Sequence, residues 1–376
     1  MPTMLPIVKP GAVSLADVLP DSVSALDGRR GRLGLPAARA VVVIVVDGLG
    51  AQALANRAGH ARTLVAARAR SIDSVVPSTT AAALTTILTG AWPGVHGLVG
   101  YRAIDRRNDR VVNQLSGWDD RMLPETWQRS PTVFEGIADG PVSAVAVGPT
   151  KFAGSGLTRA ILRGAPYVGE DDVARRFAIA AERARAERTL TYVYVPELDK
   201  AGHKGGVESS EWMTALEYLD AEVAVLESAV PRRTGIMITA DHGMLDIPHD
   251  SHVLLSQHTD VMAGVRHVAG EPRFLHLGLE HPDDAPNVVA AWEERFGDSS
   301  WITARDDAIA AGWFGTEVSV EARERMGDVL VAPRRRIAFY DDRHADDPGR
   351  GMVGQHGSLT PEERSVPVIR LGAWRR

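Results

Sequence analysis

Runs of consecutive apolar residues alternate along most of the chain with segments whose apolar residues recur at helical spacing. The run "AVVVIVVDGLG" (40–50) is rich in β-branched residues and ends in Asp-Gly, which is typical of a strand buried on both faces of a parallel sheet. Similar runs predict strands at 71–78, 142–150, 189–199 and 234–243, and helical spacing predicts helices at 80–89, 172–188 and 209–230. Because strands and helices alternate, we expect an α/β fold with a mostly parallel sheet flanked by helices.

The pattern changes between residues 264 and 330. "GEPRFLHLGL" (270–279) predicts a strand, "APNVVAAWEERFG" (285–297) a helix and "GDVLVAP" (327–333) another strand. "SVPVIRLGAW" (365–374) then predicts a final strand of the main sheet. We therefore expect a small inserted α+β subdomain at 264–330, with a catalytic α/β core formed by 1–263 and completed by 331–376.

Composition excludes several classes of protein. The chain of 376 residues has a net charge of −6 and no cysteine, which argues against binding of a nucleic-acid polymer and excludes disulfides, thiolate metal sites and cysteine nucleophiles. The apolar run at 40–46 is far shorter than the ~20 residues of a membrane-spanning helix. The first residues, "MPTMLPIVKPG", do not resemble a signal peptide, so we expect a cytoplasmic protein. Nothing in the sequence indicates an oligomeric state.

Polar residues capable of chemistry follow several of the predicted strands. They are Asp47, the pair Thr79 and Thr80, Asp199 with His203, Asp241 with His242, and His356 ahead of the last strand. In an α/β sheet ligands bind beyond the carboxyl ends of the strands. These residues are therefore expected at one edge of one sheet.

Each of these residues also has an ordinary structural interpretation. Asp47-Gly48 suits a turn, and a threonine before an apolar helix suits an N-cap. Gly202 argues against a regular helix that would bring Asp199 and His203 onto one face. His344 competes with His356 as a ligand, but the small neighbours Gly354 and Gly357 favour His356 because they allow close approach of the backbone.

Taken together, the aspartates and histidines form a suitable ligand set for two divalent ions, with zinc the favoured metal. Two such ions repel each other strongly at ~4 Å. The charges of Asp47, Asp199, Asp241 and a threonine alkoxide would cancel the charge of both ions. A metal-activated threonine hydroxyl is then a plausible nucleophile.

The sequence resembles the type I phosphodiesterase/nucleotide pyrophosphatase family of the alkaline phosphatase superfamily. The resemblance runs in order from Val41 to the C-terminus, through "VVDGLG", "VPSTTAAALTTILTGAWPGVHGLVG", "ELDKAGHKGG", "ITADHGM" and "GQHG". It implies an alkaline-phosphatase-like core and a metal-dependent hydrolase that cleaves a phosphodiester or pyrophosphate bond of a small phosphorylated substrate.

The resemblance also implies roles for individual residues. Thr80, rather than Thr79, would be the nucleophile and form a covalent phospho-threonine intermediate. One metal ion would be held by Asp47, Thr80, Asp241 and His242, and the second by Asp199, His203 and His356.

Two departures from the family pattern concern the substrate. The F-P-N stretch after the nucleophile is here Ala81-Ala82-Ala83, and Tyr101 stands where the family has an asparagine that donates to a phosphate oxygen. Lys200 and Lys204 flank the Asp199/His203 pair and could meet the anionic end of a substrate or lie in solvent. A phosphonate or phosphomonoester hydrolase and a non-catalytic ligand-binding relative remain the alternatives.

Overall fold

The computed structural model describes residues 4–9, 11–67, 70–343 and 348–375. Within these residues the largest sheet has seven strands in the order β2-β17-β8-β1-β7-β5-β6. Their bounds are β2 (Arg70–Asp73), β17 (Ser365–Gly372), β8 (Thr234–Thr239), β1 (Ala40–Val46), β7 (Thr189–Val195), β5 (Ser143–Gly148) and β6 (Tyr167–Gly169). The pairs from β8 to β6 are parallel, whereas β17 runs antiparallel to β8 and β2. The predicted mostly parallel sheet is confirmed.

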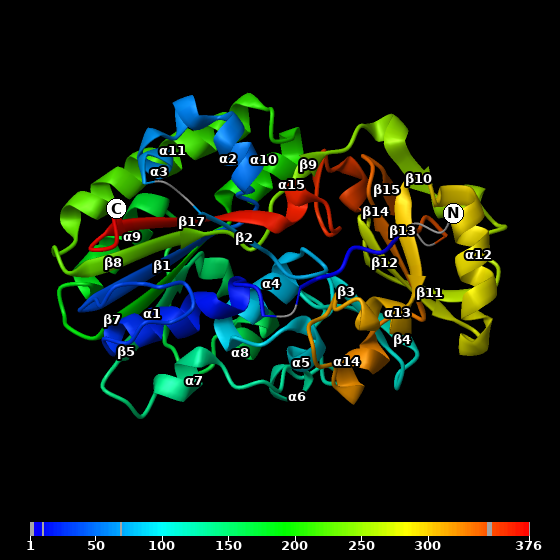
Figure 1. The fold of residues 1–376 in the computed structure, drawn as a ribbon, viewed down its shortest axis with the longest axis horizontal. Helices are drawn as coiled ribbons and strands as arrows, with labels where there is room; N and C mark the ends of the chain where they lie inside the picture. Colours follow the sequence, from blue (N-terminus) through cyan, green and yellow to red (C-terminus); the bar gives the residue numbers. More distant parts are fainter. Residues whose placement is uncertain (1–3, 10, 68–69, 344–347, 376) are drawn as a thin grey trace.

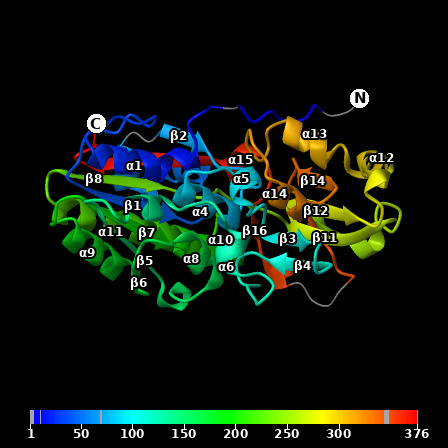
Figure 2. The same cartoon turned by 90° about the horizontal axis from the view of Figure 1, so that it is seen from below.

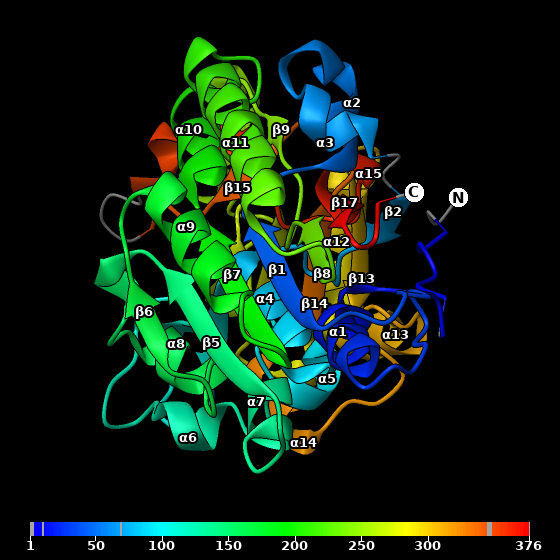
Figure 3. The same ribbon diagram turned by 90° about the vertical axis from the view of Figure 1, so that its left-hand side faces the viewer.

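Helices cover both faces of this sheet (Figure 3). α9 (Val173–Arg183) and α11 (Ser210–Ala229) lie on one face, and α1 (Val18–Leu26) and α4 (Thr80–Thr89) lie on the other. All seven residues of β1 are buried, as expected for a central strand with helices on both sides. The predicted bounds of α4 agree with the structure, and those of α9 and α11 agree within a few residues.

A second, four-stranded sheet has the antiparallel order β11-β12-β14-β13 and occupies the right half of Figure 1. Its strands are β11 (Val265–Glu271), β12 (Phe274–Leu279), β13 (Ser300–Ala304) and β14 (Val329–Pro333), and α12 (Ala285–Phe296) packs beside it. The hairpin β3 (Arg102–Asp105) and β4 (Arg110–Asn113) lies against β11 (Figure 2). The division of the chain at residues 264 and 330 stays a prediction.

Three predicted elements differ from the structure. The strand expected at 189–199 ends at Val195, and its last residues belong to the helix that begins at Glu197. The single strand expected at 270–279 is a hairpin, because β11 ends at Glu271 and β12 begins at Phe274 after the turn Pro272-Arg273. The strand expected at 71–78 ends at Asp73, ahead of Pro77, which lacks the N–H that a strand interior needs.

The expectation about Gly202 was wrong. The helix α10 (Glu197–Gly205) includes this glycine in its interior. A Cβ on Gly202 would collide with Met244 Sδ, so the glycine permits close packing of the helix rather than ending it. Asp199 and His203 therefore do share one helical face, one turn apart.

Candidate metal centre

Five of the six aspartate and histidine candidates gather at the carboxyl ends of three neighbouring parallel strands, whereas His356 follows β16 (Gly354–Gln355). Asp47 follows β1, Asp241 and His242 follow β8 after Ala240, and α10 follows β7 after Pro196. β7 and β8 pair with β1 from its two sides, in register along its length. This register places residues from distant parts of the sequence at one sheet edge.

Thr80 is the first residue of α4. Thr79 occupies the N-cap position, but its side chain makes no capping hydrogen bond. The Thr80 hydroxyl oxygen lies 3.1 Å from His242 Nε2. The structure therefore directs the Thr80 hydroxyl toward the aspartates and histidines.

Two overlapping groups of side chains offer ligand atoms that all lie within 4.8 Å of one another. One consists of Asp199, His203 and His356, and the other of Asp47, Asp199 and His242. Asp199 thus belongs to both. Asp241 stands beside the second group, with its Oδ2 3.5 Å from His242 Nε2, while its Oδ1 accepts hydrogen bonds from the backbone N–H groups of Gly48 and His242.

Backbone carbonyls orient the three histidines. Nδ1 of His203 lies 2.8 Å from Gly354 O, Nδ1 of His242 lies 3.0 Å from Gly243 O, and Nδ1 of His356 lies 2.9 Å from Ser78 O. Because a carbonyl can only accept a hydrogen bond, each Nδ1 carries the proton in the neutral ring. Each Nε2 then presents a free lone pair, as in a histidine prepared to bind a metal.

The electrostatics of this group are unfavourable for charged carboxylates that have neither a proton nor a cation beside them. Burial raises the pKa of Asp47, Asp199 and Asp241, and the neighbouring charges of Asp241 and Asp199 raise that of Asp47 further. Burial lowers the pKa of His242, and that of His356 to well below its usual value. Neutral His242 Nε2 nevertheless faces Asp47 Oδ1 at 3.3 Å. A lone pair facing a carboxylate without a proton between them is unfavourable unless a cation binds both.

Three buried oxygens provide the clearest test of whether divalent ions fit. Asp47 Oδ1, Asp199 Oδ1 and Asp241 Oδ2 have no hydrogen-bond partner in the described part of the chain. The second oxygen of Asp47 accepts a hydrogen bond from the Tyr194 hydroxyl. Buried polar atoms are normally satisfied, so these oxygens fit the ligand set of a metal centre.

Asp47, Asp199, His203 and His356 line a cavity of about 390 Å³, whereas Asp241 and His242 are not among its lining residues. Thr80, Tyr101 and Lys200 line it, but Lys204 is exposed and is not among the lining residues. His344, the alternative to His356 as a metal ligand, lies outside the described residues. Sequence reasoning missed further lining residues, namely Arg102, Phe152, Tyr194 and Glu271. They follow no motif and reach the cavity only through folding.

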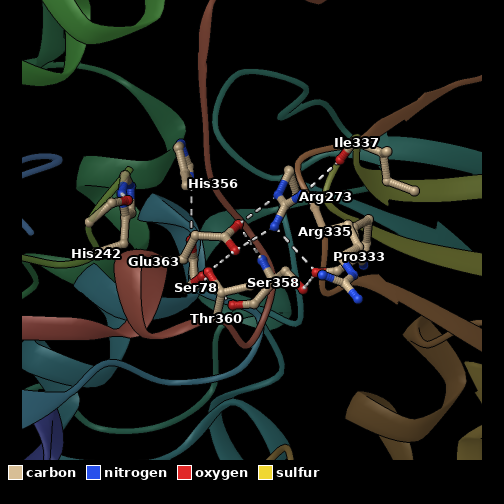
Figure 4. A network of polar contacts seen from close by, with 11 residues as sticks. Ser78, His242, Arg273, Pro333, Arg335, Ile337, His356, Ser358, Thr360 and Glu363 are labelled. Atoms are coloured by element: carbon tan, nitrogen blue, oxygen red, sulfur yellow. Dashed lines mark hydrogen bonds and ion pairs between the residues drawn. The ribbon is translucent and has the colours of Figure 1, made fainter. Parts of the chain in front are cut away.

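A network of buried hydrogen bonds supports the segments that carry Thr80 and His356 (Figure 4). Ser78 donates its N–H to Gly357 O at 3.0 Å and its hydroxyl to Ser358 O at 2.7 Å. Ser358 N–H donates to Glu363 Oε1 at 2.9 Å, and Glu363 forms a fully buried ion pair with Arg273 at 2.7 Å. Both segments are therefore attached to one buried framework.

Comparison with known proteins shows the family to which this chain belongs. Residues 41–359 match the family model described as type I phosphodiesterase / nucleotide pyrophosphatase. The chain belongs to this family. Among curated proteins, ectonucleotide pyrophosphatase/phosphodiesterase family member 3 of Rattus norvegicus is 28% identical over 169 residues, which is 42% of this chain and 19% of that protein. The match thus spans about a fifth of the relative's length.

Solved structures with the same fold cover most of the chain. Murine ectonucleotide pyrophosphatase / phosphodiesterase 5 superposes with a TM-score of 0.68 at 14% identity, covering 88% of this chain and 87% of that one. Phosphonoacetate hydrolase from Sinorhizobium meliloti 1021, in complex with phosphonoformate, has a TM-score of 0.68 at 19% identity and covers 92% of both chains. At these identities the likeness establishes the fold of this family member. Among the described residues, we find no helix with the length and apolar character needed to cross a bilayer.

Proposed function

We propose that this family member is a two-metal hydrolase that cleaves a phosphodiester or pyrophosphate bond through a covalent phospho-threonine on Thr80. The observation that carries the proposal is the convergence of the candidate ligands on the Thr80 hydroxyl, which lies 3.1 Å from His242 Nε2. Asp47, Asp199, His203, Asp241, His242 and His356 would hold the ions, together with the Thr80 oxygen. Zinc suits the mixed Asp/His set, and manganese or iron could occupy the same shell.

Divalent ions supply Lewis-acid stabilisation of the charge that develops on oxygen. The protein positions the nucleophile. Thr80 lies at the N-terminus of the ten-residue helix α4, where the backbone amides stabilise negative charge. In the first step a bond forms between Thr80 Oγ1 and phosphorus, the bond to the leaving group breaks and the hydroxyl proton is lost to water. In the second step water attacks phosphorus, the bond to Thr80 breaks and the hydroxyl is restored.

Replacement of Thr80 by alanine tests the proposal. We expect T80A to lower kcat on an aryl phosphodiester by at least ~1,000-fold. The neighbouring side chains cannot form the covalent bond to phosphorus in place of the Thr80 hydroxyl. Metal content should stay near that of the unmodified protein. Thr89 is the matched control, since it lies in the same helix and donates its hydroxyl to Thr85 O. Full activity in T80A would remove Thr80 from its role.

A phosphonate hydrolase is the second candidate. Lys200 and Arg102 line the cavity, and two cations would suit a substrate with an additional anionic group. A comparison of rates on an aryl diester, an aryl monoester and phosphonoacetate separates these reactions. A preference of phosphonoacetate over the diester by kcat/KM would favour the phosphonate reaction. The cytoplasmic location expected from the sequence stays a prediction.

A further inference from the structure

A buried glutamate outside the candidate ligand set reaches the same cavity. Glu271 is the last residue of β11, in the four-stranded sheet, and its exposed fraction is 4%. It lines the cavity together with Thr80 and His356. The glutamate therefore reaches the cavity from the four-stranded sheet, whereas Asp47 reaches it from the end of β1 in the seven-stranded sheet.

Only one oxygen of this carboxyl group is used by the fold. Oε2 accepts a hydrogen bond from the backbone N–H of Tyr101 at 2.9 Å. Oε1 is buried and has no hydrogen-bond partner among the residues that the structure describes. An unsatisfied buried oxygen costs about 1–3 kcal/mol. A purely structural link between β3 and β11 would not need this second oxygen to remain free.

Two glycines provide space for the carboxyl group. A Cβ on Gly357 would lie 2.5 Å from Glu271 Cγ and 3.0 Å from Oε1, and a Cβ on Gly100 would lie 3.4 Å from Oε2. Gly357 directly follows His356. Glu271 Oε1 therefore lies against the segment that supplies a candidate metal ligand.

The surroundings of Glu271 determine its charge. Burial raises the pKa of Glu271 to about 8, the Tyr101 N–H and Arg102 on β3 act to lower it, and Glu363 raises it. His356, beside Gly357, is held neutral by burial. A pKa raised in this way favours the protonated carboxyl group near pH 7, and a protonated carboxyl group can donate a hydrogen bond. A neutral donor is compatible with an anionic phosphoryl group, which a carboxylate would repel.

We propose that Glu271 is a substrate-binding residue whose Oε1 donates a hydrogen bond to an oxygen of the substrate's phosphoryl group. The inference rests on the proposed function, because it takes a phosphoryl group as the ligand. It adds a specificity-determining contact from the four-stranded sheet to a site otherwise built at the edge of the seven-stranded sheet.

The experiment measures binding of inorganic phosphate by calorimetry to zinc-loaded protein in the T80A background, so that turnover plays no part. We expect E271L, which removes both oxygens at similar volume, to weaken phosphate binding about tenfold, the equivalent of one lost hydrogen bond. E271Q should retain most of the affinity, because its amide can accept from Tyr101 N–H and donate to phosphate. Glu280→Gln is the matched control, an exposed glutamate directly after β12.

Metal content and the thermal unfolding midpoint are measured for each variant. Affinity of E271L within twofold of the parent, or equal weakening in E271Q and E271L, would overturn the proposal. If E271L does not fold, the pH dependence of phosphate affinity is compared between E271Q and the parent protein. As pH rises from 6.5 through about 8, the parent loses its donor, so its phosphate affinity should fall relative to that of E271Q.

A constant affinity ratio across this pH range would contradict the donor role. The test also separates this inference from the proposed function. Unimpaired turnover by T80A would contradict the covalent mechanism, whereas loss of phosphate affinity in E271L would still assign Glu271 to the binding site.

Discussion

At the scale of single residues, burial leaves polar atoms of the candidate centre without hydrogen-bond donors, whereas buried histidines outside the centre have hydrogen bonds to both ring nitrogens. The oxygens of Asp47, Asp199 and Asp241 that have no donor among the described residues are buried, which is unfavourable for charged carboxylates in the absence of a cation. Binding of divalent ions would offset this cost. The centre is therefore expected to couple metal affinity to stability.

Two other buried histidines are fully satisfied as neutral rings. His276 Nε2 donates to Val99 O at 3.1 Å and its Nδ1 accepts from Gly327 N–H at 3.1 Å. His96 has the same pattern, with Thr86 Oγ1 near Nε2 and Leu98 N–H donating to Nδ1. In each ring a second proton would face a donor N–H. Burial lowers the pKa of His276 to about 4 and that of His96 to about 3.

These pKa values predict loss of stability in mild acid. Below pH 6.5 the unfolded chain takes up protons that the folded histidines refuse, so stability is complete above pH 6.5 and falls as pH decreases toward 4. Lowering the pH from 7 to 5 should cost roughly 2 kcal/mol through His276 alone. In H276Q this part of the loss should disappear from the free energy of unfolding, measured by urea denaturation at both pH values. An equal loss in H276Q and the unmodified protein would contradict the assignment.

At the scale of elements, α10 is positioned by the absence of a side chain. Gly202 packs against Met244, and Gly354 on β16 (Gly354–Gln355) lies so close that a Cβ there would stand 2.6 Å from Gly202 O. The same β16 residue accepts the Nδ1 proton of His203 through its carbonyl. Gly354 therefore both allows close packing of α10 and orients the candidate ligand His203.

A methyl group at Gly202 should displace α10 and weaken the centre. We expect G202A to lose about 1–3 kcal/mol of stability through overpacking, in spite of the higher helix propensity of alanine, and to bind zinc more weakly. Zinc titration followed by calorimetry and thermal unfolding measures both effects. Gly136 in α7 (Val133–Ile137) is the matched control.

Apart from the adjoining residues and the backbone of its own helix, no heavy atom of the described residues lies within 4 Å of a Cβ built on Gly136. G136A should therefore gain up to ~1 kcal/mol from helix propensity and bind zinc as the unmodified protein does. Equal zinc affinity in G202A and G136A would show that α10 tolerates the added volume.

At the scale of the whole molecule, the Arg273–Glu363 ion pair joins the two sheets. Arg273 lies in the turn between β11 and β12, and Glu363 lies in α15 (Pro361–Arg364) next to β17. Arg273 also donates to the carbonyls of Pro333, Arg335 and Ile337. The Glu363 carbonyl accepts from Gly243 N–H at 2.8 Å, directly after His242.

Removal of one member of this pair should be severe. E363A leaves the Arg273 charge buried and unpaired, and we expect a loss of about 3–5 kcal/mol in the free energy of unfolding by urea. The double variant R273M/E363M should lose less, because neither charge remains. E321A, which breaks the exposed pair Arg129–Glu321, should change stability by less than ~1 kcal/mol. A smaller loss in E363A than in the double variant would contradict this interpretation.

Much of the fold could be predicted because its strands and helices have strong local patterns. The bounds of α4 and the central position of β1 follow from apolar runs that admit few alternatives. The hairpin at β11 and β12 was missed because Pro272-Arg273 interrupts a single apolar run without a glycine or asparagine turn signal. The interior position of Gly202 in α10 depends on Met244, which lies in another segment.

The sequence by itself determined the types of side chain available for chemistry and the strand ends at which they stand, because burial of a parallel sheet imposes long apolar runs whose ends are readable. Only the tertiary structure decided which atoms face each other: Asp199 shared between both ligand groups, Thr80 directed at His242, and Glu271 brought to the cavity from a different sheet. These relations depend on strand order and on packing between segments far apart in the chain, and no local pattern of residues encodes them.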